Sequence, residues 1–189
     1  MMSITNAEKT SVAMAEFSAL KTEIATRTTS QNALANITIV AVGAIGGYTF
    51  GSPNASKLIL LVLVPVAIAT GLLWLDHAHA IYNIGTYVRD RLWTELRSLL
   101  HSDISTYEDY VLHGQPVWRE RSVLILPFFI LFVGPCLAAL VVVARFADAA
   151  WARVAWALEI IALMYFIVTW VSFLKESLSH SRPADDGSS

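Results

Sequence analysis

Residues 16–51 form one stretch that is amphipathic at its start and apolar at its end, with no helix-breaking residue between. Phe17, Leu20 and Ile24 recur at helical spacing among charged residues, which predicts one apolar stripe on a helix. Residues 33–50 then contain no charge, and this length suits a membrane crossing. We therefore expect a single helix that begins in water and ends in lipid.

The composition extends this expectation to the whole chain. Hydrophobic residues make up 56% and charged residues 15% of the 189 residues, whereas a soluble domain has about 25% charged residues. The net charge of −2 predicts no nucleic-acid partner. Cys136 is the only cysteine, which excludes disulfides within the chain and CxxC metal sites. Residues 1–30 lack the features of a signal peptide, so the first span is expected to direct its own insertion.

Four apolar segments predict an all-α integral membrane protein with four transmembrane helices, at residues 33–50, 58–75, 123–144 and 151–174. Residues 51–54 predict a tight turn, Pro65 a kink in the second span, and Pro127 and Gly134-Pro135 a bend in the third. The predicted parts are a cytoplasmic amphipathic helix (1–31), a transmembrane hairpin (32–75), a cytoplasmic helix and loop (76–120), a second hairpin (121–174) and a disordered cytoplasmic tail (175–189).

The second span has no breaker at its end, so residues 76–100 are expected to continue it as an amphipathic helix. Its apolar stripe consists of Ile81, Ile84, Val88, Leu92, Leu96 and Leu99. This extension matches residues 8–31 in length, so the two should pair antiparallel and reach roughly 35 Å into water. Residues 105–108 match a capping box that would start a short helix ending near Gly114.

The distribution of Lys and Arg predicts the orientation, because such residues are enriched in cytoplasmic segments. Three lie in the N-terminal segment, five between the second and third spans and two in the tail, ten in total, against three on the other side. The three are Lys57, Arg145 and Arg153. Both termini and both amphipathic helices should therefore be cytoplasmic.

Two short motifs resemble a family of small uncharacterised bacterial multi-pass membrane proteins. In that family an ALxxEI…R…Q helix precedes the first span and an IGxYxR helix follows the second. The matching residues here are Ala19, Leu20, Glu23, Ile24, Arg27, Gln31, Ile84, Gly85, Tyr87 and Arg89. The hairpin is also distantly similar to SLATT domains, two-span effector modules of bacterial conflict systems, from which this chain departs by having two further spans. The resemblance implies a bacterial inner membrane and no particular substrate.

Glu159 is the only acidic residue that we expect inside a span, about 12 Å from its outer end. A carboxylate there is costly, so it must face other helices, take up a proton or meet water. It could serve as a proton or cation site. Alternatively, it is a structural group bonded to Asn36, Thr38 or another subunit.

Asp76, His79 and Asn83 share one helix face at the cytoplasmic end of the second span, whereas His77 points elsewhere. A polar interfacial rim is one interpretation and a metal or pH-sensing site is the other. No second His or Cys motif completes a metal site, so neither a metal nor a cofactor is expected.

Two sets of residues are expected to pack helices together. Gly43, Gly46 and Gly47 give the first span a small-residue face that suits close approach by the second span or by another subunit. Glu23, Arg27, Tyr87, Arg89 and Arg91 are candidates for pairing the cytoplasmic helices, with Glu23 facing Arg89 or Arg91. Trp74, Trp118, Trp151 and Trp170 suit interfacial belts.

The sequence contains no GxSxG, HExxH, P-loop or Rossmann motif, so no catalytic residue and no enzyme activity are expected. We expect a non-enzymatic, homo-oligomeric membrane module, such as a pore-forming or membrane-perturbing effector controlled by its cytoplasmic helices. Its partners would be the lipid bilayer, other copies of the chain, and a cytoplasmic protein that docks on residues 8–31 and 76–100. The alternative is a small proton- or cation-coupled transporter or channel that uses Glu159.

Overall fold

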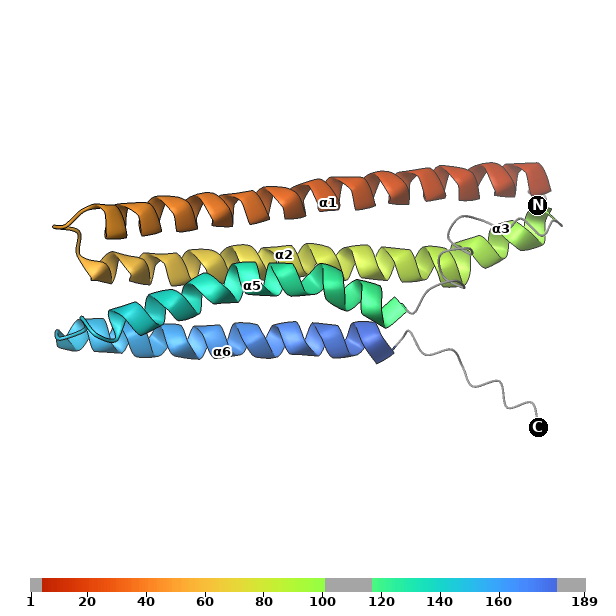
Figure 1. Ribbon diagram of the computed structural model, residues 1–189. Helices are drawn as coiled ribbons and strands as arrows, with labels where there is room; N and C mark the ends of the chain where they lie inside the picture. The colour runs from red at the N-terminus through yellow and green to blue at the C-terminus, as the bar shows by residue number, and fades with distance from the viewer. Residues whose placement is uncertain (1–4, 101–116, 180–189) are drawn as a thin grey trace, which may run out of the picture.

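The computed structural model describes residues 5–100 and 117–179, and every regular element in these two ranges is a helix (Figure 1). The elements are α1 (Asn6–Gly51), the 3₁₀ segment η1 (Lys57–Val62), α2 (Leu63–Tyr87), the π-helical segment η2 (Val88–Leu92), α3 (Trp93–Leu100), α5 (Val117–Val143) and α6 (Ala150–Ser179). The all-α fold class is confirmed for the described residues. The capping box at residues 105–108 and the end of its helix lie outside them.

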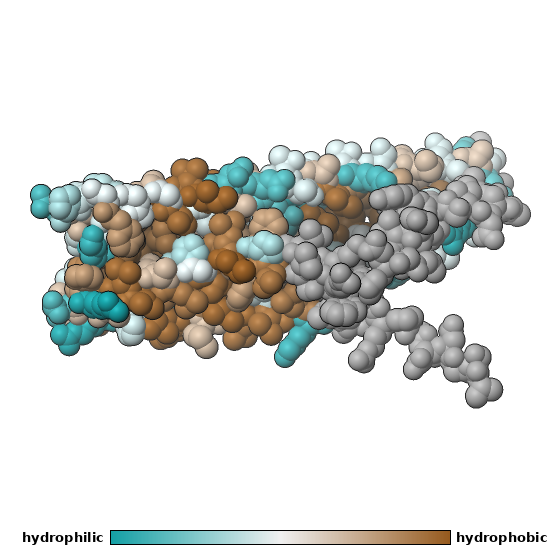
Figure 2. All heavy atoms as spheres, viewed as in Figure 1, coloured by the Kyte–Doolittle hydropathy of each residue, from teal (hydrophilic) through white to brown (hydrophobic). Residues whose placement is uncertain are grey.

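In the part of the chain that the structure describes, four helical stretches are long and apolar enough to cross a membrane, as the sequence predicted. They are Asn6–Gly51, Lys57–Leu99, Leu126–Val143 and Ala150–Glu176. Figure 1 shows them side by side, with α1 at one edge and α6 at the other. Figure 2 shows apolar residues gathered where all four helices run together, and hydrophilic residues along the N-terminal half of α1.

The first helix is one uninterrupted element of 46 residues. Its start is fixed by a capping box: the Glu8 N–H donates to the Thr5 hydroxyl, and the Thr5 N–H donates to the Glu8 carboxylate at 2.8 Å. This T-x-x-E pattern at residues 5–8 is a helix-start signal in the sequence, and α1 accordingly begins at Asn6 rather than at residue 1. At the other end the Ser52 N–H donates to the Tyr48 carbonyl, and the predicted turn follows Gly51.

The molecule divides into a bundle and a stalk. The bundle is the part where α5 and α6 lie along α1 and α2; the stalk, residues 6–27 with residues 80–100, is the part where α1 runs beside the C-terminal end of α2, η2 and α3 (Figure 1). The stalk has its own small core of Ala13, Val88, Leu92 and Leu96, with Phe17, Leu20, Ile84 and Trp93 packed around it. Residues from both predicted cytoplasmic helices therefore bury apolar side chains against each other.

The predicted helix at residues 76–100 differs from expectation in one respect, because the π-helical segment Val88–Leu92 interrupts it. Ile84, Val88, Leu92 and Leu96 are spaced by four residues, and in an α-helix each such step drifts by about 40° around the axis. A π-helical turn holds more residues and absorbs this drift. Val88, Leu92 and Leu96 can thus all be buried against α1, at 6%, 1% and 2% exposure.

Pro65, for which the sequence predicted a kink inside the second span, lies at the junction of two helical segments. It lies in the first turn of α2, where its missing N–H has no intrahelical partner to lose, and the chain before it forms the 3₁₀ segment η1. Pro127 and Pro135 both lie inside α5, which is bowed in Figure 1 in agreement with the predicted bend. The last helix continues to Ser179, five residues beyond the predicted end of the span at residue 174.

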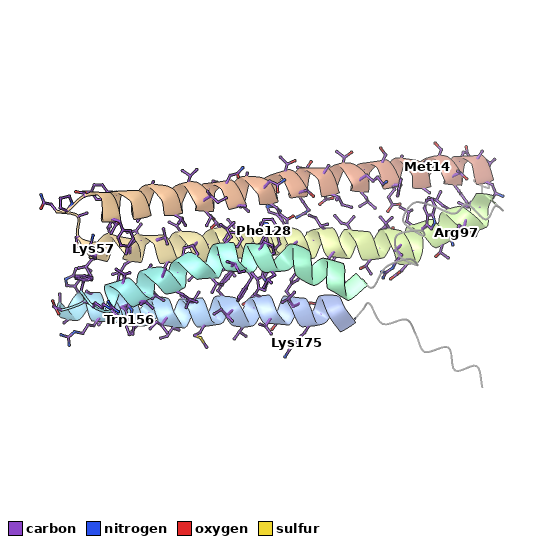
Figure 3. The ribbon with its side chains drawn as sticks, viewed as in Figure 1. Met14, Lys57, Arg97, Phe128, Trp156 and Lys175 are labelled. Atoms are coloured by element: carbon purple, nitrogen blue, oxygen red, sulfur yellow. The ribbon has the colours of Figure 1, made fainter. Side chains whose placement is uncertain are left out.

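The bundle core is built on aromatic residues. The Trp74 and Trp170 rings are stacked with centroids 5.4 Å apart, and Phe128, which points into the bundle in Figure 3, stacks on Trp74 at 4.7 Å. Trp74 is 5% and Trp170 0% exposed. Both rings therefore pack against other helices in the core. Trp151, by contrast, is exposed, and the side chain of Trp118 lies outside the described part.

Candidate functional site

Three interhelical hydrogen bonds set the register of α1 against α2. The hydroxyls of Thr38 and Thr70 are 2.7 Å apart, the Gln31 amide donates to the Trp74 carbonyl at 3.2 Å, and the Tyr87 hydroxyl donates to the Glu16 carboxylate at 2.8 Å. The partners advance in opposite directions along the two helices, so the pairing is antiparallel. Thr70 is the only hydroxyl-bearing residue in residues 58–75, and this was the signal in the sequence that could have identified the contact.

The ion pairs predicted between the two stalk helices are wrong. Glu23 binds Arg27 on its own helix at 2.7 Å, an i,i+4 pair, and Arg89 binds its neighbour Asp90 at 2.6 Å. Arg91 is exposed. A partner one turn away costs less side-chain ordering than one on another helix, which explains the local pairing.

Tyr87, also in this predicted set, does contact the other helix. Its hydrogen bond to the Glu16 carboxylate raises the pKa of Tyr87 above the ordinary value of 10.0, because that bond needs the phenol proton. At the N-terminal end of α1, the hydrogen bonds from Thr5 lower the pKa of Glu8. Both contacts lie in the stalk.

The sequence left two partners open for the glycine face of α1, the second span or another subunit. The structure shows that this face is not packed on the second span. A Cβ added to Gly43, Gly46 or Gly47 would meet nothing within 4 Å. The face of α1 that does contact α2 carries Thr38 and Thr49 instead, both buried. Gly43 and Gly47 lie on the outward side of α1, which also exposes Asn36.

Glu159 lies in α6, is half-buried, and is near Cys136 of α5. Its Oε2 atom is buried and has no hydrogen-bond partner. The predicted partners on α1 do not supply one, because Thr38 is bonded to Thr70 and Asn36 is exposed. Figure 1 shows α1 and α6 at opposite edges of the bundle.

Asp76 and His79 lie in a groove between α2 and α6, with a volume of about 350 Å³. From α2 the groove is lined by Leu72, Leu75, Asp76 and His79. From α6 it is lined by Thr169, Ser172, Phe173 and Glu176. The third residue of the predicted cluster, Asn83, is exposed and does not line the groove.

Each helix contributes to the groove at positions i, i+3, i+4 and i+7, which is one face of a helix. The His79 and Phe173 rings meet edge to face at 6.1 Å and join the two walls. The sequence analysis did not recognise the polar residues of α6 as part of this cluster. Their helical spacing was visible, but which helix they face depends on how the second hairpin packs on the first.

Within residues 5–100 and 117–179 no group of three His, Cys, Asp or Glu residues is placed to hold a metal ion. The groove residues therefore do not combine into a metal site. The chain matches no family model, no curated protein and no solved structure.

Proposed function

We propose that this chain is a multi-pass protein of the bacterial inner membrane, in which the stalk passes a cytoplasmic signal to the membrane-embedded bundle. The role is non-enzymatic: the bundle perturbs or permeates the membrane, and the stalk controls it. The observation that carries this proposal is the unbroken helix α1. Its 46 residues extend about 69 Å, more than twice the hydrocarbon thickness of about 30 Å.

A continuous helix transmits a displacement of its end along its length, because its backbone hydrogen bonds resist bending. The second helix of the stalk differs, since the segment Val88–Leu92 is π-helical. π-Helical segments are rare overall, and those that do occur are often found at functional sites. A partner at the stalk tip would bind residues 6–27 and 80–100 together, and the π-helical segment is where the second helix would change register against α1.

The Lys and Arg distribution supports cytoplasmic termini. In the structure, two of the three basic residues on the opposite side bind backbone carbonyls: Lys57 donates to the Thr49 carbonyl near the end of α1, and Arg153 donates to the loop carbonyls of Ala147 and Asp148 at 3.1 and 2.9 Å. A reporter that is active only in the periplasm should be inactive when fused after Ser181 and active when inserted after Asn54. The opposite pattern would overturn the orientation.

Homo-oligomer formation is the second part of the proposal. The open glycine face of α1 offers a flat surface for another copy in lipid, where small residues allow close helix approach. Gly43→Leu and Gly47→Leu should lower the mass of the detergent-solubilised particle, whereas Gly85→Leu, on an exposed position of the stalk, should not. A wild-type particle with the mass of one chain would exclude the oligomer.

The coupling itself can be tested by locking the stalk. Glu16→Cys with Tyr87→Cys replaces two residues whose long side chains meet end to end, so a reducible bifunctional thiol reagent can bridge the two shorter cysteines, and Cys136 is buried in the bundle. We expect dye release from liposomes containing the untreated full-length protein, loss of release on crosslinking, and recovery with reductant. The single variant Glu16→Cys should not respond to the crosslinker. Equal release from the locked and reduced proteins, or none from either, would refute the proposal.

Glu159 supports a second candidate function, a proton- or cation-coupled carrier or channel. A buried carboxylate oxygen without a hydrogen-bond partner, at the depth of the predicted fourth span, is costly to keep for structure alone. Its position near the contact of α5 and α6 would place the exchanged proton or cation inside the bundle.

A further inference from the structure

Asn36 carries an amide on the outside of α1, three residues inside the apolar segment that begins at residue 33. Its side chain is exposed and has no hydrogen-bond partner among the described residues. The polar residues at a similar depth, Thr38 and Thr70, bond each other instead. An amide without a partner is costly beside hydrocarbon, whereas an amide that bonds a neighbouring helix stabilises the contact. Asn36 therefore calls for a polar group on a helix outside this bundle.

Asn36 belongs to a face of α1 that is small and uncharged from the stalk to the loop end of the bundle. This outer face is defined by residues at steps of four or seven, all of them exposed: Ser18, Ala25, Thr29, Asn36, Gly43 and Gly47. The buried Thr38 and Thr49 lie on the opposite side of α1, toward α2. Figure 1 shows α1 at one edge of the molecule, so the other described helices leave the outer face uncovered.

The charged side chains in the stalk part of α1 are directed away from this outer face. Glu16 accepts a hydrogen bond from Tyr87 on the second stalk helix, and Arg27 is paired with Glu23. Lys21 lies over an aromatic ring of the stalk at 4.8 Å from its centroid. A helix face that meets only water is usually charged or strongly polar, and lipid would not reach the stalk. Neither solvent alone explains one uncharged face that continues through both regions.

We propose that the outer face of α1 packs against the same face of a second copy, in a symmetric dimer whose α1 helices are parallel. Copies inserted in one orientation are related by a twofold axis along the membrane normal, which brings the two Asn36 side chains to the same depth. An amide both donates and accepts, so each Asn36 complements the other. Gly43 and Gly47 allow the backbones to approach closely. The Thr29 hydroxyl does not obstruct this approach, because it already bonds a carbonyl of its own helix at 3.0 Å.

This inference rests on the homo-oligomer part of the proposed function and deepens it. It names the partner as one further copy, gives the direction of pairing, and assigns Asn36 as the residue that sets the register. A single buried amide is known to fix both the register and the number of helices in such pairs. It also extends the contact beyond the glycines into the stalk, to Ser18 and Ala25.

Cysteine crosslinking of the full-length protein in membranes tests the extent of the contact. Ser18→Cys and Gly43→Cys lie on the outer face, whereas Ala19→Cys and Ala44→Cys are the adjacent exposed positions off it. We expect oxidation to give a covalent dimer with both variants of the outer face and with neither neighbour. The wild type should give none, because Cys136 is buried. Crosslinking at only one of the two outer positions, at neither, or equally at all four would overturn the proposal.

The role of Asn36 is tested by measuring self-association by resonance energy transfer as the protein is diluted in lipid. Asn36→Leu should weaken association roughly three- to tenfold, as expected for one interhelical hydrogen bond in a membrane. Asn36→Leu with Ile37→Asn moves the amide off the outer face and should not restore association. Wild-type association in Asn36→Leu, or recovery in the double variant, would exclude the amide contact.

Failure of this inference is distinguishable from failure of the proposed oligomer. A wild-type particle with the mass of one chain would exclude both. A wild-type oligomer that forms no crosslinks through the outer face, or that does not depend on Asn36, would overturn this inference alone and leave an oligomer built on another surface. Neither measurement involves dye release, so both are independent of whether the stalk controls the bundle.

Discussion

The hydroxyl of Thr38 lies 2.7 Å from the hydroxyl of Thr70, and both residues are buried where α1 meets α2. Each hydroxyl is also within hydrogen-bonding distance of a backbone carbonyl of its own helix, Leu34 for Thr38 and Val66 for Thr70. Two hydroxyls in apolar helices thus satisfy each other and fix both the rotation and the register of α1. The hydrogen bond from Gln31 to the Trp74 carbonyl also fixes the register, nearer to the stalk. The hydrogen bond from Tyr87 to Glu16 does the same within the stalk.

We predict that Thr38→Val and Thr70→Val are coupled. Interhelical hydrogen bonds between membrane helices contribute about 0.6 kcal/mol on average and up to about 1.7 kcal/mol, so each single variant should lose this amount and the double variant little more. Thermodynamic unfolding of the full-length protein in mixed micelles measures all three. Thr26→Val is the control, because the Thr26 hydroxyl bonds only the Thr22 carbonyl on an exposed part of α1. Strictly additive losses would contradict the coupling.

Gly71 is required where α2, α5 and α6 meet. A Cβ at this position would lie 2.6 Å from Cζ of Phe166 and 3.1 Å from Cγ of Phe132. Both phenylalanines are fully buried, so neither can move without displacing its neighbours. Gly71→Ala should therefore destabilise the bundle by about 1–3 kcal/mol. Gly85→Ala, with open space around its Cβ, should instead stabilise the protein by roughly 0.5–1 kcal/mol. A thermal unfolding midpoint for Gly71→Ala at or above the wild-type value would contradict this view of the core.

The sequence predicted the helices and the stalk pairing because these depend on periodicity within one segment. The stripe of Ile84, Val88, Leu92 and Leu96 determined which side of the second stalk helix is buried, and its spacing by four also contained the signal for the π-helical segment. The charged contacts were predicted wrongly for Glu23 because a suitable Arg27 lies one turn away. Sequence spacing says which residues share a face, but it does not rank partners on one helix against partners on another.

The sequence predicted the α2 wall of the candidate site but not its α6 wall. Asp76 and His79 were grouped correctly, since both lie on one face of α2. Thr169 and Glu176, which line the same groove, belong to α6, about ninety residues later in the sequence. The rotation of α6 about its axis is set by the burial of Phe166 and Trp170. The open glycine face likewise depends on α1 lying at the edge of the bundle, which no local pattern specifies.

Val88→Asp should separate the two helices of the stalk without unfolding the bundle. Val88 is 6% exposed in the stalk core, and a charge there has no partner, which costs roughly 1–3 kcal/mol or more. Hydrogen exchange of residues 6–27 and 80–100 should accelerate, while exchange in α6 stays unchanged. Thr94→Asp, on the exposed side of α3, is the matched control. Unchanged protection of the stalk in the Val88 variant would show that the two helices do not depend on this core.

The contact between Tyr87 and Glu16 predicts a pH dependence of the stalk. Because the pKa of Tyr87 is raised in the folded state above 10.0, the contribution of this bond to stability is present below pH 10.0 and is lost as the pH rises through the higher folded value. NMR titration of labelled tyrosine should show Tyr87 ionising at higher pH in the wild type than in Glu16→Gln. Tyr87→Phe should remove this alkaline loss of stalk protection. Identical titration of Tyr87 in the wild type and in Glu16→Gln would mean that the bond does not form in solution.

Glu159→Gln distinguishes the two roles left open for the buried carboxyl. The amide keeps the size of the side chain and its hydrogen-bonding capacity, but it cannot exchange a proton or hold a cation by charge. If Glu159 is structural, the variant should retain the expression level, oligomer mass and ion flux of the wild type. If it carries protons or cations, we expect normal expression and mass but loss of pH-dependent ion flux in liposomes. We expect the second outcome, because lipid cannot solvate a carboxylate at this depth and the Oε2 atom has no hydrogen-bond partner among the described residues. Asp148→Asn is the control, since it removes an exposed carboxylate from the loop between α5 and α6. Unchanged flux in Glu159→Gln, or no flux from the wild type at any pH, would leave Glu159 as a packing residue of the bundle.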